Sequence, residues 1–373
     1  MRALVLTVVH HPDDARIRHR QVAALLAAGW QVSYAAPFSG YAVTRAPEAG
    51  LTTLDVPRAH GRHRGRALRA ARSLLRERAA GHDVVLVHDP ELLLAVRGLP
   101  VPVVWDVHED TAAALRTKPW LPPAVVPVAA AAVRRAERAA ERRVHLLLAE
   151  DAYRDRFAGP HPVVPNCAHV PATVRRPDDP RVVYVGHLTR ARGADDLVAA
   201  GRALADTGIR VELVGHADAE ATTLLARAHD RGVVDWRGFL PSAQAMGRVA
   251  GATAGLSLLH DEPNYRHSRP TKVLEYLAHG VPALTTPLPL AARTVEDSGG
   301  GVVVPFGGSA EVGAATADAV RRLVGDPDRR RAMGAAGHAW ARAHVDWALH
   351  APGFVRAMTA YAGRSAPDVA QEA

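Results

Sequence analysis

The sequence NYRHSRPTKVLEYLAHGVP, residues 264–282, follows an apolar run, AGLSLLH, at residues 254–260. Pro270 stands where a first helical turn would begin, and Gly280 stands where that helix would end. Proline is favoured at the first helical position and glycine just after the last one. We therefore predict a strand, a loop and then a short helix over residues 270–279.

Three polar residues lie near the start of this predicted helix: Thr271, Lys272 and Glu275. The first turn of a helix has unpaired backbone N–H groups and a partial positive charge, so it suits a phosphate. Glu275, one turn further along, can reach a sugar hydroxyl attached to that phosphate. A solvated helix face explains Lys272 and Glu275 equally well, so the rest of the chain must decide between the two interpretations.

Strand-like apolar runs alternate with helix-period segments along the whole chain, which predicts βαβ units and parallel sheets. The helix-like segments include residues 17–28, 111–116, 194–205 and 218–228, and residues 329–361 are expected to form two more helices. The candidate strands are residues 3–9, 31–36, 83–87, 101–107 and 144–149 in a first series, then 181–185, 210–214, 233–236, 254–259, 282–285 and 301–304.

A stretch rich in proline and short polar residues, 159–180, separates the two series of strands and reads as an interdomain segment. We expect an α/β protein with two Rossmann-like domains whose parallel sheets face each other across a cleft. The first domain spans residues 1–165, residues 166–180 form the linker and residues 181–346 form the second domain. The helix at about 347–362 is expected to return to the first domain, and residues 363–373 are expected to fray.

The chain has 373 residues, enough for two domains, and a formal net charge of +8. Its only lysines are Lys118 and Lys272, so almost all of the positive charge is arginine. This charge favours anionic partners such as nucleotide phosphates or acidic lipids. The single Cys167 excludes an internal disulfide framework. We expect a cytoplasmic protein, because no membrane-spanning run or signal peptide is apparent.

The segment YVGHLTRARG, residues 184–193, ends a predicted strand, turns at Gly186 and leads into a helix. Arg190 and Arg192 in this turn can each fork onto a diphosphate, although surface arginines explain either one alone. Further on, DWRGFLP (235–241) puts a glycine after a strand, where a flat base can lie near Phe239 and Leu240. Along the chain, a basic turn is followed by a place for a flat base and then by the start of a helix. This order favours a nucleotide site.

These motifs together resemble retaining glycosyltransferases of family 4, which have the GT-B fold. The resemblance rests on residues 264–282, on YVGHLTRARG and on GGGVVVP (299–305), with Pro-Thr-Lys…Glu-Tyr as its most specific part. In the first half, HHPDDARIRHRQVAALLAAGW (10–30), VHDPELL (87–93) and WDVHED (105–110) resemble the family's opening segment and its next loops.

The resemblance implies roles for individual residues. Glu275 matches the family's second glutamate, which holds the nucleotide ribose, and His267 stands where the family usually has its first glutamate, with Ser268 beside it near the donor sugar. His187 replaces an arginine that many members use for the pyrophosphate, which leaves Arg192 as the basic candidate. His108 matches a histidine near the sugar. Acceptor contacts are assigned to Asp13, Asp14, Arg16 and Glu109.

The activity that the resemblance implies is transfer of a hexose from a nucleoside-diphosphate sugar, with retained configuration and no metal or other cofactor. His108, Lys272 and Arg192 are the expected catalytic residues, and the leaving diphosphate takes the acceptor's proton in a front-face displacement. A uridine-diphosphate sugar is the favoured donor, with guanosine- and thymidine-diphosphate sugars as alternatives. The acceptor, a glycan, a lipid-linked saccharide or a small natural product, stays open.

Two other enzyme classes remain as alternatives. The loop His11-Pro12-Asp13-Asp14 is similar to the metal loop of zinc-dependent sugar deacetylases, but Ala15 stands where those enzymes have a glutamate. The only H-x-x-H, from His60 to His63, lies in an arginine-rich run that would repel a dication. Sugar-nucleotide epimerases share the GT-B architecture, but the Pro-Thr-Lys…Glu-Tyr segment argues against them.

A non-enzymatic alternative rests on charge. Residues 58–78, RAHGRHRGRALRAARSLLRER, form a basic amphipathic stretch in which Leu68, Leu74 and Leu75 make an apolar side. Such a helix can lie on an acidic membrane, and this would also suit an enzyme with a lipid-linked acceptor at the inner membrane face. Nucleic acid is not expected as a partner, because the stretch has no aromatic residue to stack on bases. A solvated helix explains the stretch as well, and the oligomeric state stays open.

Overall fold

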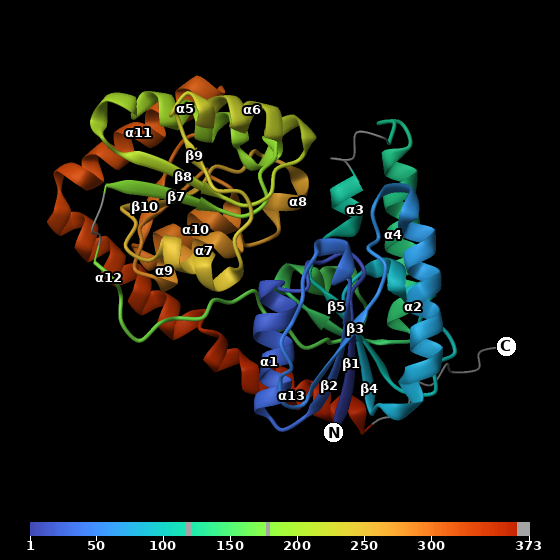
Figure 1. The fold of residues 1–373 in the computed structure, drawn as a ribbon. Coiled ribbons are helices and arrows are strands. Elements are labelled where there is room, and N and C mark those ends of the chain that lie inside the picture. Colours follow the sequence, from blue (N-terminus) through green and yellow to red (C-terminus); the bar gives the residue numbers. More distant parts are fainter. Residues whose placement is uncertain (116–120, 177–179, 364–373) are drawn as a thin grey trace. The chain divides into compact units, whose positions relative to one another are not determined.

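The computed structural model describes residues 1–115, 121–176 and 180–363, which leaves most of the predicted frayed tail outside the described residues. The chain divides into two compact units (Figure 1). Unit 1 combines Met1–Pro165 with the C-terminal segment that starts at Leu349, and unit 2 runs from Asn166 to Ala348. The Pro-rich stretch at 159–180 therefore contains the boundary between Pro165 and Asn166.

Unit 1 is built on a six-stranded sheet in which every pairing is parallel. The strand order is β3-β2-β1-β4-β5-β6, with β3 at Leu51–Asp55, β2 at Gln31–Ala36, β1 at Arg2–Leu6, β4 at Val84–Val87, β5 at Val103–Val107 and β6 at His145–Leu148. Five of these strands overlap the predicted ones. The sequence reading missed β3, since LTTLD at the sheet edge is half polar and mostly exposed.

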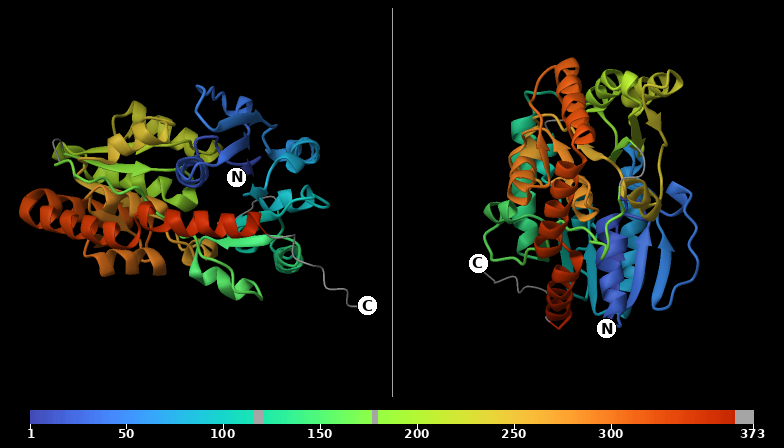
Figure 2. Two further views of the ribbon diagram at one scale, coloured as in Figure 1. Left: turned by 90° about the horizontal axis from the view of Figure 1, so that it is seen from below. Right: turned by 90° about the vertical axis from the view of Figure 1, so that its left-hand side faces the viewer.

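Helices cover both faces of this sheet (Figures 1 and 2). The elements are a π-helix at Ala15–Val22, α1 at Ala23–Ala27, α2 at Arg64–Arg78, α3 at Thr111–Ala114, α4 at Val126–Glu141 and α13 at Trp347–Ala362. The predicted helix at 17–28 is thus a π-helix that continues into α1. A π-helix is rare and is often found at functional sites, and here it follows the first strand directly.

The apolar side of α2 is part of the unit 1 core. Leu75 is fully buried, and Leu68 and Leu74 pack against the same cluster, which includes Leu6 of β1 and Trp105 of β5. The leucines that could have faced a membrane therefore pack in the interior of unit 1. What α2 presents outward is a row of arginines.

The C-terminal helix α13 lies beside β6 in unit 1 (Figure 2). The ring of Tyr361 stacks on His145, with 4.3 Å between ring centroids, and its hydroxyl donates to the Leu146 carbonyl oxygen at 3.3 Å. Phe354 and Met358 on the same helix are fully buried. The last described helix thus completes the core of a sheet that begins at residue 2.

Unit 2 repeats the architecture with a second six-stranded parallel sheet. Its order is β12-β11-β10-β7-β8-β9, with β12 at Gly301–Val303, β11 at Ala283–Thr285, β10 at Ala254–Ser257, β7 at Arg181–Val185, β8 at Arg210–Val214 and β9 at Asp235–Trp236. All six overlap the predicted strands. The strand order reverses between β7 and β10, and ligands of such sheets bind at the carboxyl ends near a reversal of this kind.

The helices of unit 2 surround this sheet (Figure 1). They are α5 at Ala194–Ala203, α6 at Ala219–Asp230, α7 at Ser242–Val249, α8 at Pro263–Arg266, α9 at Thr271–Ala278, α10 at Pro289–Ser298, α11 at Ser309–Gly325 and α12 at Pro327–His344. The predicted helix at 270–279 is α9. In the part of the chain that the structure describes, no helix combines the length and hydropathy that a bilayer crossing requires.

Candidate functional site

Helix α9 is anchored in unit 2 by Tyr276. The Tyr276 hydroxyl accepts from the Val185 backbone N–H at 3.1 Å and donates to the Leu256 carbonyl oxygen at 3.0 Å, so it ties α9 to β7 and β10. A Cβ at Gly255 of β10 would collide with the Tyr276 ring, so only glycine allows this approach. These contacts hold the middle of α9 against the ends of β7 and β10.

Lys272 lies in that first turn and is only 6% exposed. Its Nζ is 3.9 Å from the centroid of the Tyr184 ring, and within the described residues it has no hydrogen-bond partner. Burial lowers the pKa of Lys272 well below its ordinary value; the nearby Arg192 lowers it further, and Glu275 opposes the shift. A buried ammonium without an acceptor is costly, and an anion bound beside it would remove that cost.

Glycines bring three strand ends of unit 2 together, and one of them lies beside Lys272. Gly186 follows β7, and Gly215 follows β8 at a φ of +142°, where a Cβ would collide with the Gly186 carbonyl. The Gly215 N–H in turn donates to the Gly238 carbonyl oxygen at 2.7 Å. A Cβ at Gly186 would itself lie 3.5 Å from Lys272 Nζ. Backbone can therefore approach a ligand here without side chains in between.

The basic turn after β7 brings only one of its two arginines toward Lys272. The guanidinium of Arg192 lies 6.0 Å from the Tyr265 ring centroid, and the charge of Arg192 acts on both Lys272 and His187. Burial, then Arg192, lowers the pKa of His187. The side chain of Arg190 is 64% exposed and pairs with Asp195 and Glu220, at 3.8 and 3.5 Å. Because Arg190 pairs with these two carboxylates, its position does not support the diphosphate role that we predicted for it.

Phe239, predicted to lie near a base, stacks on His216, with ring centroids 4.9 Å apart and the planes inclined by 9°. Phe239 remains 39% exposed, so part of its surface is open to a flat ligand, and Leu240 beside it is half-buried. Motif reading did not single out His216. Its position directly after the glycine of LVGH (213–216) was the available signal.

The remaining unit 2 candidates lie on α9 or in the segment just before it. Thr271 and Glu275 are half-buried on α9 itself. His267 and Ser268 lie between α8 and α9, with His267 exposed at the end of α8 and Ser268 half-buried. Residues 264–282 thus carry the exposed imidazole of His267 before α9 and the buried ammonium of Lys272 in its first turn.

In unit 1, three residues predicted to bind the acceptor make internal contacts. Asp14 caps the π-helix by accepting from the N–H groups of Arg16 and Ile17 at 2.8 and 2.9 Å. Asp13 forms an ion pair with Arg45. Arg16 is buried and donates to both Asp106 oxygens at 2.7 Å. These three side chains therefore stabilise the loop after β1. Glu109, in contrast, lies exposed beside His108.

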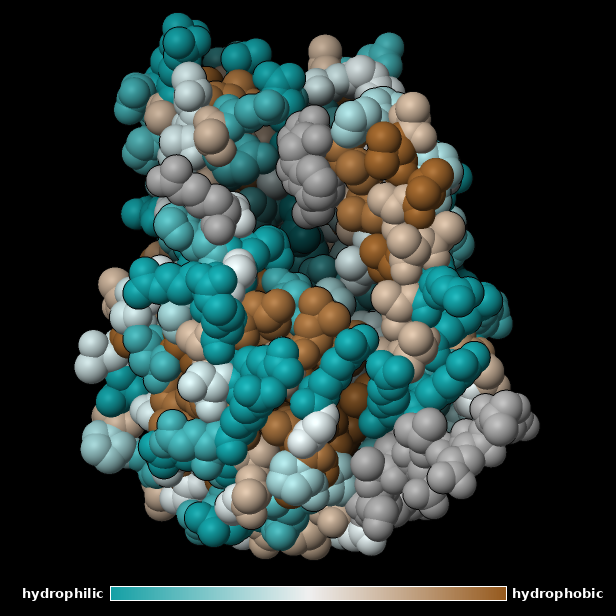
Figure 3. All heavy atoms as spheres, turned by 90° about the vertical axis from the view of Figure 1, so that its right-hand side faces the viewer, coloured by the Kyte–Doolittle hydropathy of each residue, from teal (hydrophilic) through white to brown (hydrophobic). Residues whose placement is uncertain are grey.

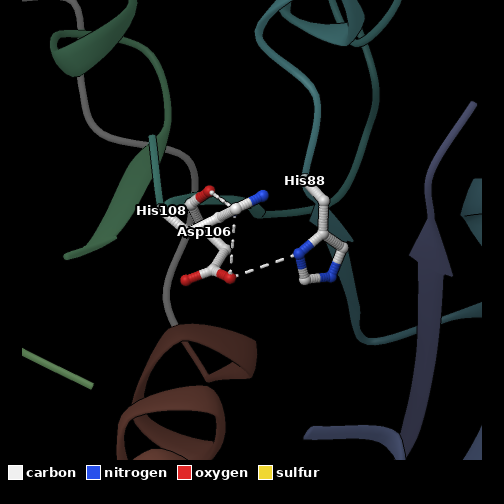
Figure 4. Close-up of side chains that lie close together, drawn as sticks. All are labelled: His88, Asp106 and His108. Atoms are coloured by element: carbon white, nitrogen blue, oxygen red, sulfur yellow. Dashed lines mark hydrogen bonds and ion pairs between the residues drawn. The ribbon is translucent and has the colours of Figure 1, made fainter. Parts of the chain in front are cut away.

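His108 lies at the end of β5 within a cluster of histidines and carboxylates (Figure 4). Ligand atoms of His88, Asp106 and His108 lie within 4.8 Å of one another. However, both Asp106 oxygens already accept from the Arg16 guanidinium, and Gln21 donates to one of them at 3.1 Å. The chemistry of this cluster therefore does not fit a dication, because the carboxylate is neutralised by a fixed cation.

The loop His11-Pro12-Asp13-Asp14 makes contacts of a different kind. His11 Nδ1 accepts from the Asp13 N–H at 3.0 Å, and its ring lies edge-on to Tyr41 at 4.7 Å between centroids. Among the described residues, no group that could hold a metal ion includes this loop, His60 or His63. The geometry therefore gives the deacetylase alternative no support.

Comparison with known proteins agrees with the two-unit architecture. Residues 179–326, most of unit 2, match the family model of glycosyl transferases group 1. Sucrose-phosphate synthase from Thermosynechococcus elongatus superposes with a TM-score of 0.74 at 18% identity, covering 96% of this chain and 98% of that one. The chain has the GT-B fold of glycosyltransferases.

Two other solved structures with this fold show the range of similar proteins. Anabaena HepE, solved in complex with UDP and glucose, has a TM-score of 0.69 at 14% identity over 96% of this chain and 100% of that one. AviGT4, a glycosyltransferase of avilamycin A biosynthesis, has a TM-score of 0.59 at 20% identity over 98% and 99%. No curated protein matches the chain.

Proposed function

We propose that this protein is a retaining glycosyltransferase of family 4 that transfers a hexose from a nucleoside-diphosphate donor to a hydroxyl group. The observation that carries the proposal is Lys272, a buried ammonium without a hydrogen-bond partner among the described residues, in the first turn of α9. Arg192 adds a second cation near it. Two cations and a helix N-terminus suit a diphosphate, which carries negative charge in the donor and gains more as it leaves.

The donor is assigned to unit 2 in a definite orientation. The diphosphate lies against the glycine turn of Gly186 and the start of α9, Glu275 accepts from the ribose hydroxyls, and the base lies on Phe239. UDP is the favoured nucleotide, since HepE was solved with UDP and with UDP-glucose. His267 and Ser268, just before α9, take the donor sugar.

The reaction is a front-face displacement without a metal cofactor. The acceptor hydroxyl attacks the anomeric carbon as the bond to the diphosphate oxygen breaks, and a diphosphate oxygen takes the hydroxyl proton. Lys272 and Arg192 compensate the charge of the leaving group in place of a dication, so the protein contributes position and electrostatics. His108 of unit 1 is the further residue that we assign to catalysis.

We place this reaction in the cytoplasm, with the acceptor at an anionic membrane surface. Figure 3 shows apolar side chains gathered over the first half of α4, with long polar side chains over the lower half of that face. Val125, which precedes α4, and Val128 in its first turn are 45% and 71% exposed. Val125→Asp/Val128→Asp should reduce sedimentation with vesicles containing anionic lipid and leave UDP binding unchanged; equal sedimentation would contradict membrane contact.

Calorimetry with UDP, GDP and dTDP tests the donor site. Lys272→Met should bind UDP about 10–100-fold more weakly, since a charged hydrogen bond is lost, whereas Arg293→Met, which removes an exposed cation on α10, should bind normally. A bound anion raises the lowered pKa of Lys272. At pH values between that lowered pKa and about 10.5, nucleotide binding should therefore be accompanied by uptake of a proton by Lys272. Titration in buffers of different ionisation enthalpy detects this uptake. No nucleotide binding, or binding unchanged in Lys272→Met, would refute the proposal.

Glu275→Ala should also lower donor use by about 10–100-fold, because it removes a charged acceptor for the ribose hydroxyls. A 2′,3′-dideoxy nucleotide should bind the wild type and this variant equally, which separates ribose contact from a folding defect. Incubation of the UDP-sugar without an acceptor distinguishes the alternative reaction, since an epimerase converts the sugar while it stays attached to UDP.

A further inference from the structure

The cluster at the end of β5 contains a histidine that the sequence reading did not select, His10. It follows β1, and its Nε2 lies 3.1 Å from the Nε2 of His108, with the ring centroids 4.8 Å apart. Two imidazoles at this distance share a hydrogen bond only when one nitrogen carries a proton and the other does not. The neighbouring contacts decide which is which.

His108 Nδ1 lies 3.0 Å from the carbonyl oxygen of Asp106. A carbonyl only accepts, so this Nδ1 carries a hydrogen. In neutral His108 the Nε2 then has a free lone pair, and the proton in the bond between the two rings comes from His10 Nε2. The geometry thus makes His10 the donor and His108 the acceptor.

Carboxylates stabilise a charge on His10. Asp89 Oδ1 lies 3.3 Å from His10 Nε2, and Asp14 Oδ2 lies 3.9 Å from His10 Nδ1. Burial opposes a charge on both rings, but in His10 the carboxylates outweigh it and the pKa is raised. In His108 burial and the His10 charge together lower the pKa. The charged groups that act on the two rings are Asp14, Asp89, Asp106, Glu109 and His88, with Arg16 held on Asp106.

We propose that His10 is a positioning residue: as an imidazolium it donates to His108 Nε2, fixes the His108 ring and excludes a second proton from the pair. A second proton would place two cations 3.1 Å apart and break the bond between them. The pair therefore carries one excess proton, on His10, and His108 stays neutral to lower pH than an isolated histidine.

The catalytic consequence rests on the proposed function, in which His108 is a catalytic residue. Protonation of the pair in acid would release the His108 ring, so the low-pH limb of kcat reports the second proton. Removing the charge of His10 raises the pKa of His108, and the limb moves to higher pH. The donor nucleotide is bound by unit 2, so the KM for the donor should change little.

Histidine-selective ¹⁵N and ¹³C NMR of the full chain tests the pair without any substrate. The signals are assigned from His10→Gln and His108→Gln. We expect the His10 midpoint to be the higher of the two, so that between the two midpoints His10 is an imidazolium and His108 is the neutral form with Nδ1 protonated. In His10→Gln, which keeps a donor but no charge, the His108 midpoint should move to higher pH. His60→Gln, a change at an exposed histidine in the same unit, should leave it in place.

A His10 midpoint at or below that of His108, or a His108 midpoint that is the same in His10→Gln and wild type, overturns the proposal. In kinetics, His10→Phe should lower kcat about 10–100-fold with donor KM nearly constant, and His10→Gln should recover part of it. Hydrogen exchange of the β1 and β5 amides checks that unit 1 of each variant folds. If no transfer is detected but the NMR result holds, the proposed function fails and the pair stands.

Discussion

Arg16 and Asp106 form an ion pair in the interior of unit 1. Arg16 is 8% exposed and Asp106 is fully buried, and the guanidinium also donates to the Val164 carbonyl oxygen at 2.9 Å. Burial would raise the pKa of Asp106, but Arg16 and His88 hold it well below its ordinary value. The pair joins the π-helix, β5 and the end of unit 1's main segment, so its loss should act on stability.

Arg16→Met should destabilise unit 1 by about 3–5 kcal/mol at pH 7, because it leaves a buried carboxylate without its cation. Native-state hydrogen exchange of the β5 amides measures this. The penalty should shrink in acid: the wild-type pair contributes fully above pH 4 and loses its contribution as the pH falls through the lowered pKa of Asp106. The double variant Arg16→Met/Asp106→Leu should recover much of the loss. A cost below about 1 kcal/mol in the single variant would contradict a buried pair.

At the level of elements, α9 packs against β10 and α12 at positions where those elements have glycine. Its end at Gly280, with a φ of +64°, packs against α12 so closely that a Cβ at Gly334 would collide with the Gly280 carbonyl. Gly337, one turn later on α12, lies against Leu277 of α9. The position of Lys272 thus depends on the small residues of α12.

Gly334→Ala should cost about 1–3 kcal/mol in unit 2 by overpacking, and should weaken UDP binding by displacing α9. Gly325→Ala is the matched control, since nothing lies within 4 Å of a Cβ there and alanine favours a helix. Thermal unfolding with and without UDP measures both effects. Equal behaviour of the two variants would show that α12 does not position α9.

For the whole molecule, the chain enters unit 1 twice. Its first 165 residues form the sheet, and the segment from Leu349 packs α13 on the same unit after the chain has completed unit 2. The pairing of Tyr361 with His145 and Leu146 spans most of the sequence. Unit 1 therefore reaches its final stability only when the C-terminal helix is present.

Phe354→Ala should destabilise unit 1 by about 3–5 kcal/mol, although it lies near the C-terminus, because it empties a fully buried site. Leu349→Ala on the same helix, at a residue that is 55% exposed, should cost little. Hydrogen exchange should increase at β6 and leave β7 and β8 unchanged. Increased exchange in unit 2 and not at β6 would contradict the packing of α13 on unit 1.

Periodicity alone predicted most of the fold. The spacing of apolar runs and glycines gave eleven of the twelve strands in the described residues, because parallel strands buried on both faces are continuous apolar runs. It missed β3, whose edge position tolerates threonine. The same reasoning found the helix start that carries Lys272, since Pro270, Gly280 and the apolar face of α9 are all local signals.

Only the tertiary structure decided which polar residues meet. Asp13, Asp14 and Arg16 occur in a promising motif, yet Asp13 pairs with Arg45, Asp14 caps the π-helix and Arg16 pairs with Asp106. Arg190 pairs with acidic residues, whereas the charge of Arg192 acts on Lys272. His10 and His108 are 98 positions apart, and no local pattern predicts that their rings share a proton. The sequence fixes each strand and its end by short-range physics. Which ends come together depends on sheet order and packing, which arise from contacts distant in the chain.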